Sequence, residues 1–146
     1  MRISRLFVVA AASLLPALPA VAQQEAKVDG LVIEFGIMPA EKAVHALGHG
    51  EAHPQKFPSG SQHLLITLAE QKSGRRIGDA DVVIEVVDPK GKSAKKTLIH
   101  TSAAGMPDYS ELFIFGWSGT YSVQVNVTSW AGAKPVKTNF TVRHQI

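Results

Sequence analysis

The segment YSVQVNVT, residues 121–128, alternates apolar and polar side chains without a break. Its tyrosine and three valines, at positions 121, 123, 125 and 127, share one face of an extended chain. This period of two predicts a β-strand with one buried face. The preceding Gly116–Gly119 segment, which reads GWSG, predicts a tight turn into that strand.

Similar short apolar runs occur on both sides of this segment and are separated by turn signals. The turns are KSGR at residues 72–75 and DPKG at residues 88–91. Alternate spacing predicts that Phe113, Phe115 and Trp117 face the core, and Met38 is expected to close the first strand from the core side. The remaining strands are expected at residues 28–37, 63–70, 80–87, 95–102, 111–115 and 137–143. Residues 105–108 are expected to be a connection. The pattern predicts an all-β fold, an immunoglobulin-like antiparallel β-sandwich of about seven strands.

Residues 38–60 differ from the rest, because proline, glycine and histidine replace the alternating pattern. We expect a long loop there, with one short helical turn around residues 40–47. Loops of this length in compact domains usually carry function or are disordered.

Residues 1–22 predict a cleavable secretory signal. Arg2 and Arg5 precede an apolar run from Leu6 to Leu15, and Ala20-Val21-Ala22 matches the small-x-small pattern that signal peptidase cleaves. A retained anchor would need about 20 apolar residues, and two prolines interrupt its second half. We therefore expect residues 23–146 to form one periplasmic or secreted domain without a membrane span.

The composition excludes several classes of function. The chain has no Cys, so thiol catalysis, a lipid-anchored N-terminal Cys and blue-copper chemistry are excluded. Signal cleavage removes two basic residues and leaves 13 Lys and Arg against 12 Asp and Glu. A charge this close to neutral gives little attraction for nucleic acid. No nucleophile elbow, phosphate loop or marked carboxylate pair is present, so we expect a non-enzymatic protein.

A histidine-rich loop carries the strongest functional signal. It reads HALGHGEAH, placing His45, His49 and His53 within nine residues, and His63 follows ten residues later. Three imidazoles with a carboxylate among them are suitable ligands for copper, zinc or nickel. Met106, between Gly105 and Pro107, is the best additional ligand, and its thioether favours Cu(I). The alternative is a solvated loop that is merely rich in histidine. His100 and His144 are poor candidates because of their strand and terminal positions.

The segment from Ser59 to Val127 resembles the YtkA-like family of exported immunoglobulin-like domains. The resemblance rests on RRIGDADV at residues 75–82, GMPDY at 105–109 and GTYSV at 119–123. It implies a β-sandwich and a role in copper or iron handling. The histidine-rich loop is a departure from that layout, so no ligand is transferred from the family.

The residues and the resemblance together predict a periplasmic metal-binding or metallochaperone-type protein. Copper, as Cu(I) or Cu(II), is the expected metal, and another exported or membrane protein is the expected partner. The alternative is a non-enzymatic interaction or structural module of an exported assembly. Its contact surface would come from the aromatic residues near the 113–117 turn and from Trp130.

Overall fold

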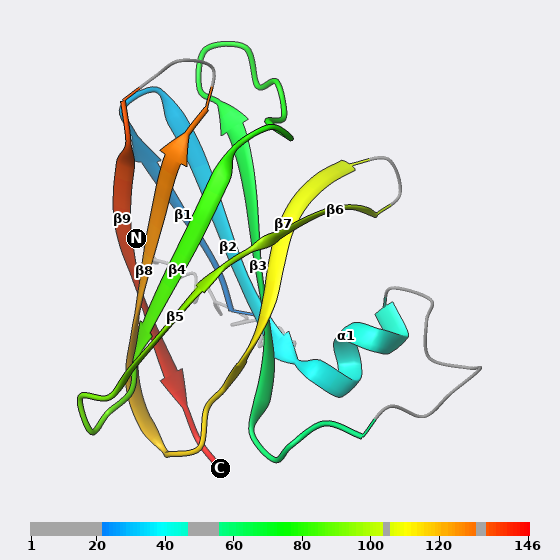
Figure 1. Ribbon diagram of the computed structural model, residues 1–146, viewed down its shortest axis with the longest axis vertical. Coiled ribbons are helices and arrows are strands. Elements are labelled where there is room, and N and C mark those ends of the chain that lie inside the picture. The colour runs from blue at the N-terminus through cyan, green and yellow to red at the C-terminus, as the bar shows by residue number, and fades with distance from the viewer. Residues whose placement is uncertain (1–21, 47–55, 104–105, 131–133) are drawn as a thin grey trace, which may run out of the picture.

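Two antiparallel sheets pack face to face in the computed structural model, which describes residues 22–46, 56–103, 106–130 and 134–146 (Figure 1). Within these ranges the strands are β1 (Ala22–Val28), β2 (Leu31–Pro39), β3 (Ser61–Glu70), β4 (Asp81–Val87), β5 (Ser93–Thr97), β6 (Ile99–Ala103), β7 (Met106–Ile114), β8 (Gly119–Ser129) and β9 (Val136–His144). Helix α1 spans Ala40–Ala46. The predicted all-β sandwich is confirmed.

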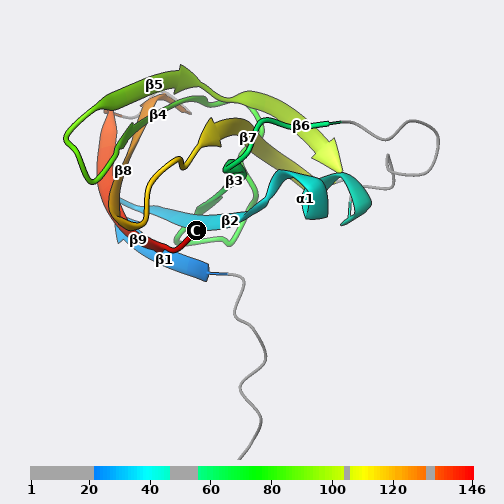
Figure 2. The same cartoon turned by 90° about the horizontal axis from the view of Figure 1, so that it is seen from below.

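The strands divide into a sheet of five and a sheet of four. The first sheet, sheet A, has the order β1-β2-β3-β7-β6, and the second, sheet B, has the order β5-β4-β8-β9. Figure 2 shows the two layers from below, with β1 and β2 in one and β4 and β5 in the other. The predicted signal peptide covers residues 1–22, of which residues 1–21 lie outside the described residues. None of the described helical segments has the length and apolarity of a membrane span.

The core lies between the sheets and is built by the alternation seen in the sequence. Tyr121 and the three valines that follow it in phase are fully buried. Phe35 of sheet A stacks on Phe140 of sheet B, with ring centroids 5.1 Å apart. Phe113 and Phe115 face the core as predicted, whereas Trp117, which lies between β7 and β8, is 48% exposed.

Two sequence expectations near the ends of strands were wrong in detail, and one was confirmed. The expected strand 28–37 is a hairpin in which β1 and β2 meet at Asp29 and Gly30, both with positive φ as a two-residue hairpin turn requires. The expected connection at residues 105–108 is mostly the start of β7. The short helical turn expected near residues 40–47 is confirmed as α1.

The expected single strand at residues 95–102 is two strands in different sheets. Strand β5 pairs with β4 in sheet B, and β6 pairs with β7 in sheet A. The chain crosses between the sheets at Leu98, whose side chain is buried and whose N–H donates to the Val82 carbonyl at 2.8 Å. On the opposite side of the sandwich, Gln24 of β1 donates its side-chain N–H to the Thr141 carbonyl of β9 at 2.7 Å.

Tyr109 ties β7 to the segment that leads into β4. Its buried hydroxyl donates to the Ile77 carbonyl at 3.0 Å and accepts from the Ala80 N–H at 3.0 Å. Burial raises the pKa of this phenol, so it stays protonated and can serve both partners. The hydroxyl therefore satisfies the Ile77 carbonyl and the Ala80 N–H, while the Ile77 N–H donates to the Leu68 carbonyl of β3 at 2.9 Å.

We predict that Tyr109→Phe lowers the free energy of unfolding by about 1–3 kcal/mol, because it leaves the buried partners of the hydroxyl unpaired. Urea unfolding followed by circular dichroism measures this value. Ser122→Ala is the matched control, since it removes a hydroxyl that is bonded to Asn139 at the exposed surface. The control should change stability by about 0.5 kcal/mol or less. Equal losses in the two variants would contradict the role assigned to Tyr109.

Candidate metal centre

The candidate site lies on the outer face of sheet A and is set by the alternation of β3. Leu64, Ile66 and Leu68 are fully buried in the core. The intervening side chains of this strand, including that of His63, therefore point away from the core. The inward phase of the apolar residues thus also determines which side chains of β3 lie on the outer face, where they can bind a ligand.

On that face His63 lies between a methionine of β2 and a leucine of β7. It pairs directly with Met38 of β2 on one side and with Leu112 of β7 on the other. Directly paired residues in antiparallel strands have Cβ atoms about 5 Å apart and share a face. An imidazole and a thioether are therefore adjacent near the end of β2.

The surroundings of His63 keep its imidazole neutral. Partial burial, which is the dominant effect, lowers the pKa of His63, while the negative charges of Asp108 and Glu111 oppose that shift. The Nδ1 atom is buried and has no hydrogen-bond partner among the described residues. A buried polar atom without a partner is costly in a folded protein and calls for an explanation. A neutral imidazole with an unpartnered nitrogen is the form that binds metal ions.

The predicted ligands lie in different parts of the chain. His45 belongs to α1, which begins directly after β2 and contacts β2 and β3. Met106 is the first residue of β7, where it pairs with Ala103. The structure does not describe the side chains of His45 and Met106. His49 and His53 fall within residues 47–55, which are not among the described residues. The ligand set predicted from sequence therefore stays a prediction.

The position of Met38 differs from the one predicted from the sequence. It was expected to close the first strand from the core side, but it lies on the outer face opposite the buried Ile37. The signal was present, because Leu31, Ile33, Phe35 and Ile37 define the inward phase and position 38 falls out of it. His63 was noted in the sequence without a role, since its unpartnered nitrogen is visible only in three dimensions.

No group of three His, Asp or Glu side chains that could hold a metal ion occurs within the described ranges. His63 and Met38 therefore supply two ligands, and a complete site needs at least one more. The other described histidines lie apart from this pair. His100 of β6 lies 5.3 Å from the Tyr109 ring, and His144 of β9 packs edge-on against Phe115 at 5.5 Å.

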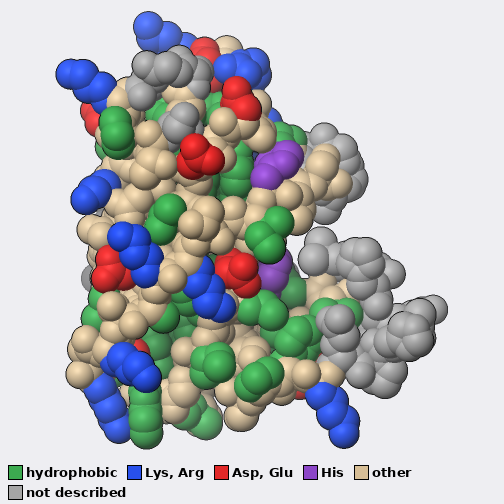
Figure 3. All heavy atoms as spheres, in the orientation of Figure 1, with side chains coloured by type: hydrophobic (Ala, Val, Ile, Leu, Met, Phe, Trp, Pro, Cys, Tyr) green, Lys and Arg blue, Asp and Glu red, His purple; other side chains and the backbone are tan. Residues whose placement is uncertain are grey.

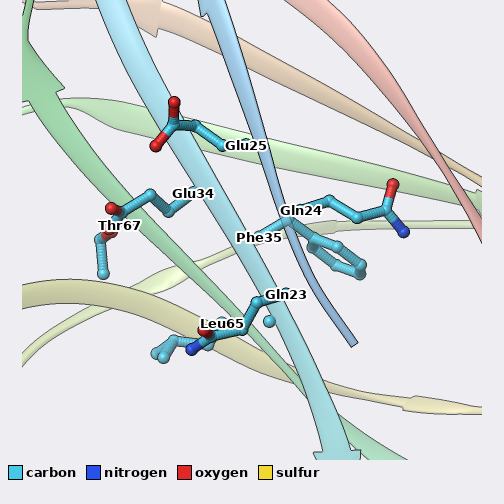
Figure 4. A pocket seen from close by; sticks show the side chains of 8 residues that line it. Gln23, Gln24, Glu25, Glu34, Phe35, Leu65 and Thr67 are labelled. Carbon is cyan, nitrogen blue, oxygen red and sulfur yellow. The ribbon is translucent and has the colours of Figure 1, made fainter. Parts of the chain in front are cut away.

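A hollow of about 240 Å³ on the outer face of sheet A is lined by residues that include Glu34, Leu65 and Thr67 (Figure 4). Two carboxylates line it, and one of them, Glu34, accepts a hydrogen bond from Thr67 at 2.5 Å and an ion-paired one from Arg76 at 2.8 Å. The hydrogen bond from Thr67, followed by that from Arg76, lowers the pKa of Glu34. Because Arg76 also donates to Thr67 at 2.8 Å, the three side chains form a closed structural network. Glu34 is already engaged, and the second carboxylate, Glu25, is exposed and ion-paired with Lys27 at 3.7 Å, so we assign this hollow no metal.

The state of His63 has a consequence for the pH dependence of stability. Because its pKa is lower in the folded than in the unfolded protein, stability is lost as the pH falls below the unfolded value of about 6.5. The loss continues until His63 is protonated in the folded protein. We therefore predict that the metal-free His63→Gln variant loses less stability than the wild type between about pH 7 and pH 5.

Thermal unfolding in the presence of a chelator measures this difference. His144→Gln serves as the control, since it removes a histidine from the other sheet. A wild-type pH dependence in His63→Gln would show that the Nδ1 environment carries no energetic cost.

The sequence matches no family model and no curated protein. Solved structures share its fold. A DUF4426 family protein from Pseudomonas aeruginosa is 14% identical with a TM-score of 0.66, and the match covers 84% of this chain and 94% of that chain. FetP from uropathogenic Escherichia coli strain F11, expressed in the periplasm, is 13% identical with a TM-score of 0.61, covering 84% and 93%.

The copper-reconstituted P19 protein of Campylobacter jejuni is 14% identical with a TM-score of 0.61, and the match covers 83% of this chain and 92% of that chain. A FetP variant and further P19 variants that match are copper-bound. Identities this low establish the shared fold alone. The β-sandwich implied by the YtkA-like resemblance is confirmed, and the family name itself stays a prediction.

Proposed function

We propose that this chain is an exported, non-enzymatic copper-binding protein whose metal site lies on the outer face of sheet A. The observation that carries the proposal is the imidazole of His63. Its Nδ1 atom has no partner among the described residues, and Met38 lies directly beside it in the neighbouring strand. Copper in this position would satisfy the nitrogen that the described residues leave unpaired.

The chemistry of this pair favours copper over harder metal ions. A thioether is a soft ligand that selects Cu(I), and an imidazole binds both oxidation states of copper. Harder cations such as Mg²⁺ and Ca²⁺ prefer oxygen ligands. The charges of Asp108 and Glu111 act on His63 and add a favourable field for a cation.

Further ligands are proposed from the histidine-rich segment and from β7. His45 follows Met38 closely in the chain, at the far end of the short helix α1. His49 and His53 come from the segment that leads back toward β3, and Met106 opens β7 two residues before Asp108. These residues are proposed as the remaining ligands because of their chemistry and their place in the chain.

Two lines of support come from outside the site. P19 and FetP share this fold and are known in copper-bound form, and the predicted signal sequence agrees with a periplasmic or secreted location. Binding rather than catalysis is favoured, because ligands on an outer face and in a loop can release an ion without opening the core. A carrier that passes copper to another exported or membrane protein would need that property.

Competition with a chromophoric Cu(I) chelator tests this function. We expect His63→Gln and Met38→Leu each to lower Cu(I) affinity by about 10- to 100-fold or more, since each removes a direct ligand. Both side chains lie outside the core, so the variants should retain the wild-type circular dichroism spectrum. His144→Gln is the matched control and should bind as the wild type does.

The triple variant His45→Ala, His49→Ala, His53→Ala tests the remaining ligands in the same assay. A loss of affinity would support the loop histidines. Unchanged binding in this triple variant would remove them from the site. Unchanged binding in the combined His63→Gln, Met38→Leu variant would refute the placement of the site on sheet A.

A further inference from the structure

A groove lies between the edge of β5 in sheet B and the edge of β7 in sheet A, on the β5 side of the crossing at Leu98. Strand β5 pairs only with β4, and β6 pairs with β7 only as far as Ser110. Residues 111–114 of β7 are therefore paired only on their β3 side among the described strands. Strand β5 contacts β7 without pairing with it, so two unpaired strand edges face each other across the sandwich seam.

Side chains take the place of a missing strand along the β7 edge. The N–H of Leu112 donates to the carboxylate of its neighbour Glu111 at 2.8 Å. The carbonyl of the same residue accepts from the ammonium of Lys96, which reaches across from β5 at 2.6 Å. Both contacts are made by exposed or partly exposed side chains that another chain can displace. The edge is thus satisfied in isolation and still open to pairing.

The groove between these edges has a hydrophobic floor. It has a volume of about 360 Å³ and contains the buried ring of Phe113. Ile114 and Trp117 also line it, and they are 62% and 48% exposed. Figure 3 shows hydrophobic side chains gathered beside Lys and Arg side chains over the lower part of this face. Large exposed apolar side chains that share one concave surface are typical of a binding site.

The rim of the groove is strongly basic. Lys92 and Lys96 line it, and the ammonium of Lys90 lies 3.1 Å from the centre of the Trp117 ring. The one acidic residue among the described lining residues is Asp88, whose carboxylate accepts from the backbone N–H groups of Lys90 and Lys92 at 2.9 Å. That carboxylate stabilises the turn, so the groove presents an excess of positive charge.

We propose that this groove binds an extended, acidic segment of a partner protein, which adds a strand to the β7 edge. The backbone of such a segment would pair with Leu112 and Ile114, as in β-strand addition. Its alternate apolar side chains would enter the groove, and its carboxylates would meet the three lysines. Lysines also protect bare strand edges from aggregation, but protection alone does not account for the exposed Ile114 and Trp117.

Titration of ¹⁵N-labelled mature protein with a peptide of alternating glutamate and valine tests the proposal, which is independent of copper. We expect saturable amide shifts centred on residues 93–97 and 111–117, and weaker or no binding of a matched lysine–valine peptide. Replacing Lys90, Lys92 and Lys96 together by glutamine should weaken binding about tenfold, because three exposed charge contacts are lost.

The control removes the same charge elsewhere, in a variant with Lys42, Lys72 and Lys137 replaced by glutamine, and it should bind as the wild type does. Ile114→Asp is a second test that leaves the Lys96 contact intact. This variant should abolish the amide shifts that the glutamate–valine peptide causes. No saturable binding, equal weakening in the two lysine variants, or shifts centred elsewhere would overturn the proposal. Dimerisation through this groove that the acidic peptide does not reverse would also overturn it, because a second copy would then be the occupant.

Discussion

The structure depends on the two-residue period of its strands. Because successive side chains point to opposite faces, each inner strand presents one face to the core between the sheets and the other to solvent. Both inward faces are apolar, and Gln62 is the one buried polar side chain among the described residues. Because the space between the sheets is filled in this way, polar chemistry is confined to the outer faces, the edges and the loops. The candidate metal centre and the basic groove occupy these places, one on a face and the other at an edge.

The crossing at Leu98 connects the two surfaces to the fold. One buried leucine anchors the chain as it passes from β5 in sheet B to β6 in sheet A, where β6 pairs with β7. On the β5 side of the crossing, the edges of β5 and β7 are not paired with each other. The exposed strand β5 places its lysines beside this gap. The crossing was not predictable from residues 95–102, because neither glycine nor proline interrupts them and pairing partners in both sheets are distant in sequence.

The sequence was most informative where one face is buried and least informative at the edges. The apolar phases of β2, β3, β4 and β8 predicted their strands, but Met38 was wrongly predicted to face the core although the phase of β2 puts position 38 on the outer face. Strand β1, with the sequence AQQEAKV, lacks an apolar phase because it is an edge strand, so it was not predicted, and the expected strand 28–37 ran through the Asp29-Gly30 turn. The role of His63 depends on one nitrogen that has no partner within the described part of the chain, which is a property of packing and is not visible in the sequence pattern.

The central claim is that His63 and Met38 together bind copper on the outer face of sheet A. X-ray absorption spectroscopy of the Cu(I)-loaded mature protein tests it most directly, because it reports the atoms bound to the metal. We expect a sulfur atom bound to the metal, whose signal is lost or diminished in Met38→Leu, and an imidazole contribution that decreases in His63→Gln. Spectra of both variants that are identical to that of the wild type would contradict the account.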